Sequence, residues 1–393
     1  MLLPSPASSP ARLADRHARD AAATLGLTLP TDVVLYLLLP LYADRFGLTL
    51  PEVGLLLAAN RLVRIAGYGW ISRLHARHGP RRMCSAAALA TLACALGAGL
   101  LSGFWALLPL RLLWGLSYAA MNLSLQALVT AQAEGAAQRS GRAQAIVAAG
   151  PMLALPLAAV LAAAWSPRAV FGVLAVCTLL ALPFARRLPP GPAAEPGAVP
   201  STPTSRMRLR RPGSLDMWSF VEGLALDGLF IIGLTVLGQQ ALPEGAVFAA
   251  GLLMAARYLS EMLLSPTGGH LAERWGAERM LVALSLLTAA ALTAFGAGGG
   301  SLSMWACAAA VVVLRALQLP LLAPIVAQRN PGPGRVPALA ARLAWRDIGA
   351  GLGPMLAGLL LPVAPPWLLY GTAAVALGAA AVACRRPKAP EES

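Results

Sequence analysis

The sequence predicts an all-α integral membrane protein with twelve transmembrane helices, arranged as two six-helix halves related by pseudo-symmetry. The first reason is composition, because 58% of the 393 residues are hydrophobic and only 12% are charged. A soluble globular chain is roughly a quarter charged. The second reason is that apolar stretches of membrane-spanning length recur along the chain, and the third is that several motifs occur twice.

An apolar helix of about 20 residues spans a bilayer. Reading along the chain gives twelve such runs, at residues 22–46, 52–72, 82–103, 105–130, 142–164, 167–186, 218–240, 246–267, 279–297, 302–326, 341–363 and 366–384. Glycine and proline inside these runs do not argue against helices, because membrane helices tolerate both. A β-barrel would instead need short strands of alternating hydrophobicity.

Several sequence features recur about half a chain length apart. The stretch Gly-Pro-Met-Leu-Ala occurs at Gly150–Ala154 and again at Gly353–Ala357. Other features pair at nearly the same spacing, namely Arg111 with Arg315, Asp32 with Asp227, and the loop 72–79 with the loop 269–276. Repetition at a nearly fixed offset indicates one duplicated unit. Transport proteins that rock one half against the other are built in this way, with the working site between the halves.

The placement of the basic residues predicts the orientation of the chain. A net charge of +14 would favour nucleic acid as a partner in a soluble protein. Here, however, Lys and Arg gather in the tails and in alternate connections, while the connections between them are nearly free of charge. This is the positive-inside pattern. We therefore expect a multi-pass protein of the plasma (inner) membrane with both termini cytoplasmic and with no nucleic-acid partner.

The same reading divides the chain into five segments. We expect a cytoplasmic N-terminal tail at 1–20, a six-helix bundle at 21–187, a Pro/Arg-rich cytoplasmic linker at 188–213, a second bundle at 214–384 and a C-terminal tail at 385–393. The linker is rich in proline and ends in a basic patch, which is typical of a semi-rigid spacer that lies against lipid headgroups. No phosphate-binding loop of the Gly-x-x-x-x-Gly-Lys kind occurs, so this chain does not supply energy from ATP.

With these motifs in order, the chain resembles a major facilitator superfamily transporter of the exporter or antiporter kind. The family's loop pattern, Gly-x-Leu-x-Asp-Arg-x-Gly, is matched well in the second half and less well in the first, where Ala76 replaces the acid. Arg111-Leu-Leu-Trp-Gly115 is similar to the family's helix-4 arginine pattern. The resemblance implies a set of gating residues, which are Arg77, Gly79, Gly269, Glu273, Arg274, Gly276, Gly150, Pro151, Gly353 and Pro354.

Charged residues inside the apolar runs are the candidate site. A lone ionisable group at the bilayer centre costs roughly 2.5–3.5 kcal/mol on insertion scales. We interpret the acids as candidates for proton coupling, namely Asp32, Asp227, Glu222 and Glu261, and the arginines as candidates for substrate binding, namely Arg61, Arg64, Arg111, Arg257 and Arg315. The alternative is that these residues form ion pairs within each bundle and only hold each half rigid.

Two geometric expectations accompany this site. Glu222 precedes Asp227 by five residues, so on an α-helix it shares a face with Asp227 only in part. Small residues around the repeated Gly-Pro allow close helix packing, and we expect the fifth and eleventh helices to cross partners from the opposite half there.

The sequence therefore predicts a secondary active transporter that moves a small organic solute by alternating access, most simply as proton-coupled efflux. The partners expected are a small-molecule substrate, protons and the lipid bilayer, and the protein is expected to be a monomer. Two alternatives stay open, which are proton-coupled uptake of an anionic solute and a membrane scaffold or sensor that transports nothing. No nucleophile–base pair, metal motif or cofactor motif occurs at a plausible spacing, so an enzyme is not expected.

Overall fold

The computed structural model describes residues 10–191, 211–241, 246–298 and 302–385. The first half of the chain forms one helical bundle, made of α1 (Pro10–Thr28), α2 (Pro30–Leu41), the short helix η1 (Ala43–Phe46), α3 (Leu50–Leu100), α4 (Phe104–Val129), α5 (Ala136–Ala164) and α6 (Pro167–Arg187). Among the described residues, the secondary structure is helical throughout, with no strand.

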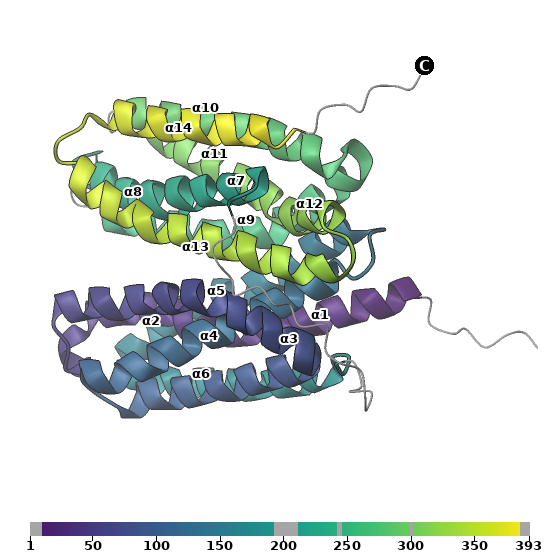
Figure 1. Ribbon diagram of the computed structural model, residues 1–393. Helices are drawn as coiled ribbons and strands as arrows, with labels where there is room; N and C mark the ends of the chain where they lie inside the picture. The colour runs from purple at the N-terminus through teal and green to yellow at the C-terminus, as the bar shows by residue number, and fades with distance from the viewer. Residues whose placement is uncertain (1–9, 192–210, 242–245, 299–301, 386–393) are drawn as a thin grey trace, which may run out of the picture.

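The second half forms a matching bundle. It consists of α7 (Ser214–Glu222), η2 (Gly223–Leu229), α8 (Phe230–Ala241), α9 (Ala246–Trp275), α10 (Ala277–Ala297), α11 (Leu302–Gln318), η3 (Leu319–Leu321), α12 (Leu322–Arg329), η4 (Gly332–Gly334), α13 (Arg335–Leu360) and α14 (Pro366–Ala383). The two bundles lie one above the other in Figure 1, and the beginning of α1 and the end of α14 point to the same side of the molecule.

Each of the twelve predicted apolar runs lies mainly on helical residues. In the part of the chain that the structure describes, nine helices are long and apolar enough to cross a membrane. The long helix α3 carries two of the predicted runs and bends between them at Gly79, where φ is 73°. A left-handed φ of this kind favours glycine. The number of membrane crossings stays a prediction.

Several helices begin earlier than their apolar runs. The first helix starts at Pro10, twelve residues before the predicted position 22, and α13 starts at Arg335, not at 341. The predicted boundaries were wrong because a search for apolar runs misses the polar turns with which a membrane helix enters the aqueous face. Pro10 itself suits a first helical turn, because that turn needs no backbone N–H donor from it.

The hydrophobic core shows where the two halves meet. One cluster of buried side chains draws on both halves, for example Trp114 and Val129 from the first and Trp218 and Leu339 from the second. Two further clusters each belong to a single half and lie toward the opposite end of the helices. The bundles are therefore joined at the end that carries the termini, which we call the closed end, and have separate cores at the other end.

Glycines allow the closest helix crossings. A Cβ on Gly141 of α5 would lie 2.3 Å from the Ser265 carbonyl oxygen of α9, and one on Gly269 would lie 2.4 Å from the Ala137 oxygen. Because α5 and α9 belong to different halves, these two glycines let the halves touch at the closed end. Small residues serve the same purpose in membrane helix packing generally.

The repeated Gly-Pro motif, in contrast, packs inside each half. A Cβ on Gly150 would lie 1.9 Å from the Gly26 oxygen of α1, and one on Gly353 would lie 2.5 Å from the Gly228 Cα of η2. The fifth and eleventh helices do cross helices of the opposite half, as expected, α5 with α9 and α13 with α3. The Gly-Pro positions themselves pack within their own half, so the crossing lies elsewhere on these helices. A composition of small residues indicates close approach but does not identify the partner helix.

Candidate functional site

The first half contains one buried ion pair. Asp32 on α2 accepts a hydrogen bond from Arg111 of α4, with 2.5 Å between Oδ1 and Nη1. The Asn60 amide on α3 donates to both carboxylate oxygens of Asp32, at 3.0 and 3.2 Å. The Tyr36 ring lies 5.5 Å from the Arg111 guanidinium carbon. Asp32 therefore has one cationic partner and one neutral donor.

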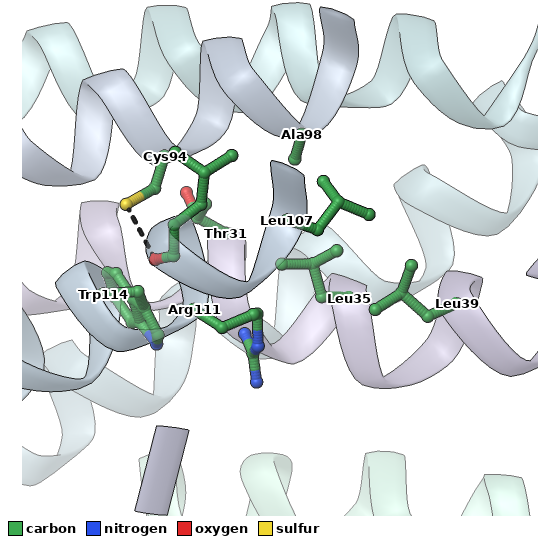
Figure 2. Close-up of a pocket in the computed structure, with 9 residues that line it drawn as sticks. Thr31, Leu35, Leu39, Cys94, Ala98, Leu107, Arg111 and Trp114 are labelled. Atoms are coloured by element: carbon green, nitrogen blue, oxygen red, sulfur yellow. Dashed lines mark hydrogen bonds between the residues drawn. The ribbon is translucent and has the colours of Figure 1, made fainter. Parts of the chain in front are cut away.

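Packing behind Arg111 fixes the position of this ion pair. Figure 2 shows Arg111 lining a small cavity together with Leu35 and Leu39 from α2 and Leu107 from α4, and Cys94 of α3 donates a hydrogen bond to the Leu110 carbonyl oxygen. These residues surround a cavity of about 10 Å³, which is at the lower limit for one water molecule. Mostly apolar side chains of α2, α3 and α4 therefore line the space beside Arg111.

The second half contains a larger charge cluster centred on Asp227 of η2. Its carboxylate lies 2.6 Å from Arg315, 2.5 Å from Arg346 and 3.5 Å from Arg257. Only 7% of the Asp227 side chain is exposed. An ionised carboxylate needs this kind of compensation when it is buried, and three guanidiniums supply it here.

Glu222 of α7 joins the same cluster. Its carboxylate lies 3.5 Å from Arg315 and 3.2 Å from Arg346, the two arginines that also hold Asp227. The expectation that Glu222 and Asp227 share a face only in part was wrong, because residues 223–229 form a π-helix. The wider turn of a π-helix brings residues five apart closer to a common face than an α-helix does. π-Turns inside α-helices occur frequently at functional sites.

Glu261 completes this cluster at its edge. It pairs with Arg257 one helical turn earlier on α9, at 3.0 Å. Arg257 also faces Asp227, so it links Glu261 to the centre of the cluster. All these partners of Glu222, Asp227 and Glu261 lie within the second half, as the interpretation of ion pairs inside each bundle expects.

Three contacts cross between α3 of the first half and α13 of the second. Arg61 donates from Nη1 to the Ala350 carbonyl oxygen at 2.6 Å. The Arg64 Nε lies 3.4 Å from an Asp347 carboxylate oxygen. The Tyr68 hydroxyl donates to the same oxygen of Asp347 at 3.0 Å. Arg61 and Arg64 thus act between the halves, whereas the other predicted arginines act within one.

The closed end carries further polar contacts between the halves. Glu273 accepts a hydrogen bond from the backbone N–H of Ala137 at 3.0 Å, in the first turn of α5. Arg335 donates to the Thr130 carbonyl oxygen at 2.6 Å. Arg342 donates to the Gln126 side chain at 3.4 Å. The second-half gating loop therefore contacts the first half directly.

The equivalent loop of the first half contacts a different segment. A Cβ on Gly79 would lie 2.1 Å from the Gly191 Cα, and Arg81 donates to the Leu188 carbonyl oxygen at 2.6 Å. This loop therefore packs against the start of the linker. Arg77 and Arg274 are exposed at the same end of the molecule.

Several residues of the site were missing from the sequence interpretation. Asn60 holds Asp32, Arg346 holds both acids of the second half, and Asp347 and Arg342 meet the first half. Neither Arg346 nor Asp347 is among the candidates that the sequence interpretation names. Both lie inside the predicted run 341–363, so a count of every charge within that run would have found them.

The fold and the sequence family agree with this architecture. The Major Facilitator Superfamily sequence model matches residues 21–243 and 244–393. The structure is similar to that of the proton:xylose symporter XylE, with a TM-score of 0.75, 13% identity and coverage of 94% of each chain. It is also similar to the human organic anion transporter MFSD10 (TETRAN), with a TM-score of 0.72, 15% identity and coverage of 94% of this chain and 99% of the other.

No curated protein sequence matches the chain. The similarity to the two solved structures is a similarity of fold, since both identities lie far below the level at which function transfers. The sequence model, by contrast, covers almost every residue in two consecutive segments. The chain therefore belongs to the Major Facilitator Superfamily and is a multi-pass membrane transporter, not an enzyme.

Proposed function

We propose that this protein is a proton-coupled secondary transporter that works by alternating access, with Asp32 as the residue that binds and releases the proton. The observation that carries the proposal is the buried Asp32–Arg111 pair in a protein whose described residues form one shared core at the closed end and separate cores at the other end. A carboxylate in this position is costly when ionised without a partner and cheap when protonated. Alternation between the two states can therefore be coupled to movement of the halves.

Asp32 suits this role better than Asp227. It has a single arginine partner and its side chain is 13% exposed, against three arginine partners and 7% for Asp227. Protonation of Asp227 would leave a cluster of guanidiniums short of one negative charge. Asp32 loses only the attraction of Arg111 on protonation, while Arg111 keeps its hydrogen bond to the Leu56 carbonyl oxygen. We assign Asp227 and Glu222 to holding the second half rigid.

The orientation follows from the charge pattern of the sequence. The closed end carries the basic connections, so by the positive-inside rule it faces the cytoplasm. On that orientation, the protein is closed to the cytoplasm and its separate cores face the outside. Both termini are then cytoplasmic, and the membrane is the plasma or inner membrane.

For the direction, we propose efflux. The support is the helix-5 Gly-Pro motif, which resembles that of exporting family members, and its close packing of Gly150 on Gly26. A second candidate is proton-coupled uptake of an anionic solute. Among the described residues of the charged site, arginines outnumber carboxylates by seven to five. The arginines are Arg61, Arg64, Arg111, Arg257, Arg315, Arg342 and Arg346, and the carboxylates are Asp32, Glu222, Asp227, Glu261 and Asp347. The similar human structure is named as an organic anion transporter.

The test uses everted membrane vesicles that contain the full chain, supplied with a small-molecule extract of the host cells. After acidification of the vesicle lumen, retained solutes are identified by mass spectrometry and compared with vesicles that carry Asp32→Asn. Proton-coupled efflux predicts one or more solutes that accumulate only with the unmodified chain. Proton-coupled uptake predicts depletion of a solute from the lumen, and a membrane scaffold predicts no difference between the two preparations.

A further inference from the structure

Asp347 differs from every other described carboxylate of the membrane-embedded site. Asp32, Glu222, Asp227 and Glu261 all pair with arginines of their own half. Asp347, on α13 of the second half, instead takes both its ion-pair partner and its hydrogen-bond donor from α3 of the first half, namely Arg64 and Tyr68. Its side chain is only 7% exposed. Its compensation therefore exists only while the halves touch here.

The charged groups around Asp347 leave Arg64 as its effective counter-ion. The neighbouring Arg346 is held by Glu222 and Asp227 of the second half, at 3.2 and 2.5 Å. Arg342, one turn earlier on α13, donates to the neutral Gln126 of α4. No other cation lies within ion-pair distance of Asp347 among the described residues.

Arg64 in turn depends on Asp347. The Tyr118 ring of α4 lies 4.8 Å from its guanidinium carbon, which is a cation–π contact. Asp347 is its only carboxylate partner within the described ranges. Arg61, one turn earlier on α3, donates to the Ala350 carbonyl oxygen on the same face of α13. The α3–α13 contact is therefore a charged junction with one carboxylate in it.

We propose that Asp347 is a proton-operated lock between the two halves, so that its protonation favours opening of the closed end. The proposal rests on the alternating-access function above and adds a residue that acts on conformation, apart from the coupling residue Asp32. Separation of α3 from α13 would take from ionised Asp347 both its counter-ion and the Tyr68 hydrogen bond. A protonated Asp347 has much less to lose, because a neutral carboxyl gains little from Arg64. Protonation of Asp347 therefore weakens the contact that holds the two halves together here.

The test measures the distance between the halves without any solute. Spin labels are attached to Ala133→Cys in the first half and Arg279→Cys in the second, both exposed at the closed end. The two partly exposed native cysteines, Cys177 and Cys307, are replaced by alanine in this background. Double electron–electron resonance in reconstituted bilayers then gives the populations of short and long distances. The measurement is repeated from pH 8 to pH 5 in steps of about one pH unit.

The unmodified junction should shift toward long distances as the pH falls. Asp347→Asn should raise the long-distance population about 5-fold or more at pH 8 and should remove most of the pH dependence. Arg64→Gln should give a similar shift, and the double variant should add little to either single one because all three lose the same pair. Tyr68→Phe, which keeps the ion pair and loses one hydrogen bond, should shift less and keep the pH dependence.

Two results would overturn the proposal, namely no pH dependence in the unmodified protein, or an unchanged pH dependence in Asp347→Asn. If Asp347→Asn does not accumulate in the membrane, Arg64→Gln makes the same comparison, with Tyr68→Phe as the control that keeps the ion pair. This experiment is independent of solute transport. Failure of the proposed function would appear as absent solute accumulation in vesicles while the spin-label distances still respond to pH.

Discussion

Glu273 of the second half caps a helix of the first half. Its Oε1 accepts the backbone N–H of Ala137, at 3.0 Å, in the first turn of α5. The N-terminal N–H groups of a helix lack internal acceptors and carry a partial positive charge. A carboxylate supplied by the opposite half therefore stabilises the closed end, in addition to the glycine crossing of α5 and α9 beside it.

Removal of this cap should loosen the closed end. Glu273→Ala deletes an interaction of about 1 kcal/mol, so we expect the long-distance population of the Ala133/Arg279 spin-label pair to rise about 5-fold. Glu134→Ala is the matched control, because Glu134 is an exposed carboxylate of the neighbouring connection. If the control shifts the distances as much as Glu273→Ala does, general electrostatics and not the cap holds this end.

Addition of an acid at the repeat-related position should have the opposite effect. Ala76 occupies the place of Glu273 in the first-half loop and is exposed. Ala76→Asp should be tolerated and should lower the long-distance population. The reason is that a carboxylate there would be attracted to the partial positive charge at the N-terminal turn of α13. Membrane abundance and the same spin-label distances are measured together. Loss of membrane insertion in Ala76→Asp would mean that the two loops are aligned incorrectly.

The Gly150 crossing should tolerate no side chain. A Cβ at Gly150 would lie 1.9 Å from the Gly26 carbonyl oxygen, so α1 and α5 must separate to admit it. We expect Gly150→Ala to destabilise the first half by about 1–3 kcal/mol and to lower the melting temperature in detergent. Gly358→Ala is the control, because no atom lies within 4 Å of its Cβ position. Equal melting temperatures for the two variants would contradict the close crossing.

Asp227 should be needed for folding. Asp227→Asn leaves Arg315, Arg346 and Arg257 short of one negative charge in a buried cluster. Breaking a buried ion pair by removal of one partner costs about 3–5 kcal/mol, so we expect the variant to be scarce in the membrane. Quantitative immunoblotting of membrane fractions measures this, with Glu261→Gln, at the edge of the cluster, as the milder comparison. Normal abundance of Asp227→Asn would argue against a structural role.

Much of the fold could be predicted because its causes are local. Apolar length placed the predicted runs mainly on helical residues, and the repeated motifs indicated the two halves. Helix ends were less accurate, as at Pro10 and Arg335, because polar turns at the aqueous face carry no hydropathy signal.

The site was predictable in its residue types but not in its pairing. The sequence indicates which charges are buried, including Asp32 and Arg111, because charged residues stand out within apolar runs. The joint contacts of Glu222 and Asp227 depend on a π-helix, which no residue pattern of this segment announces. The junction of Arg64 with Asp347 depends on which helices meet across the halves, and that is a property of the assembled fold.

The central claim is that Asp32 couples proton movement to solute movement. The most direct test compares Asp32→Asn with the unmodified chain in everted vesicles, for a solute identified by the accumulation assay. Membrane abundance, solute exchange without a pH gradient and gradient-driven accumulation are measured in the same preparations. We predict normal abundance, retained exchange and loss of gradient-driven accumulation in Asp32→Asn. Undiminished gradient-driven accumulation would contradict the claim, and loss of the protein from the membrane would assign Asp32 to a structural ion pair with Arg111.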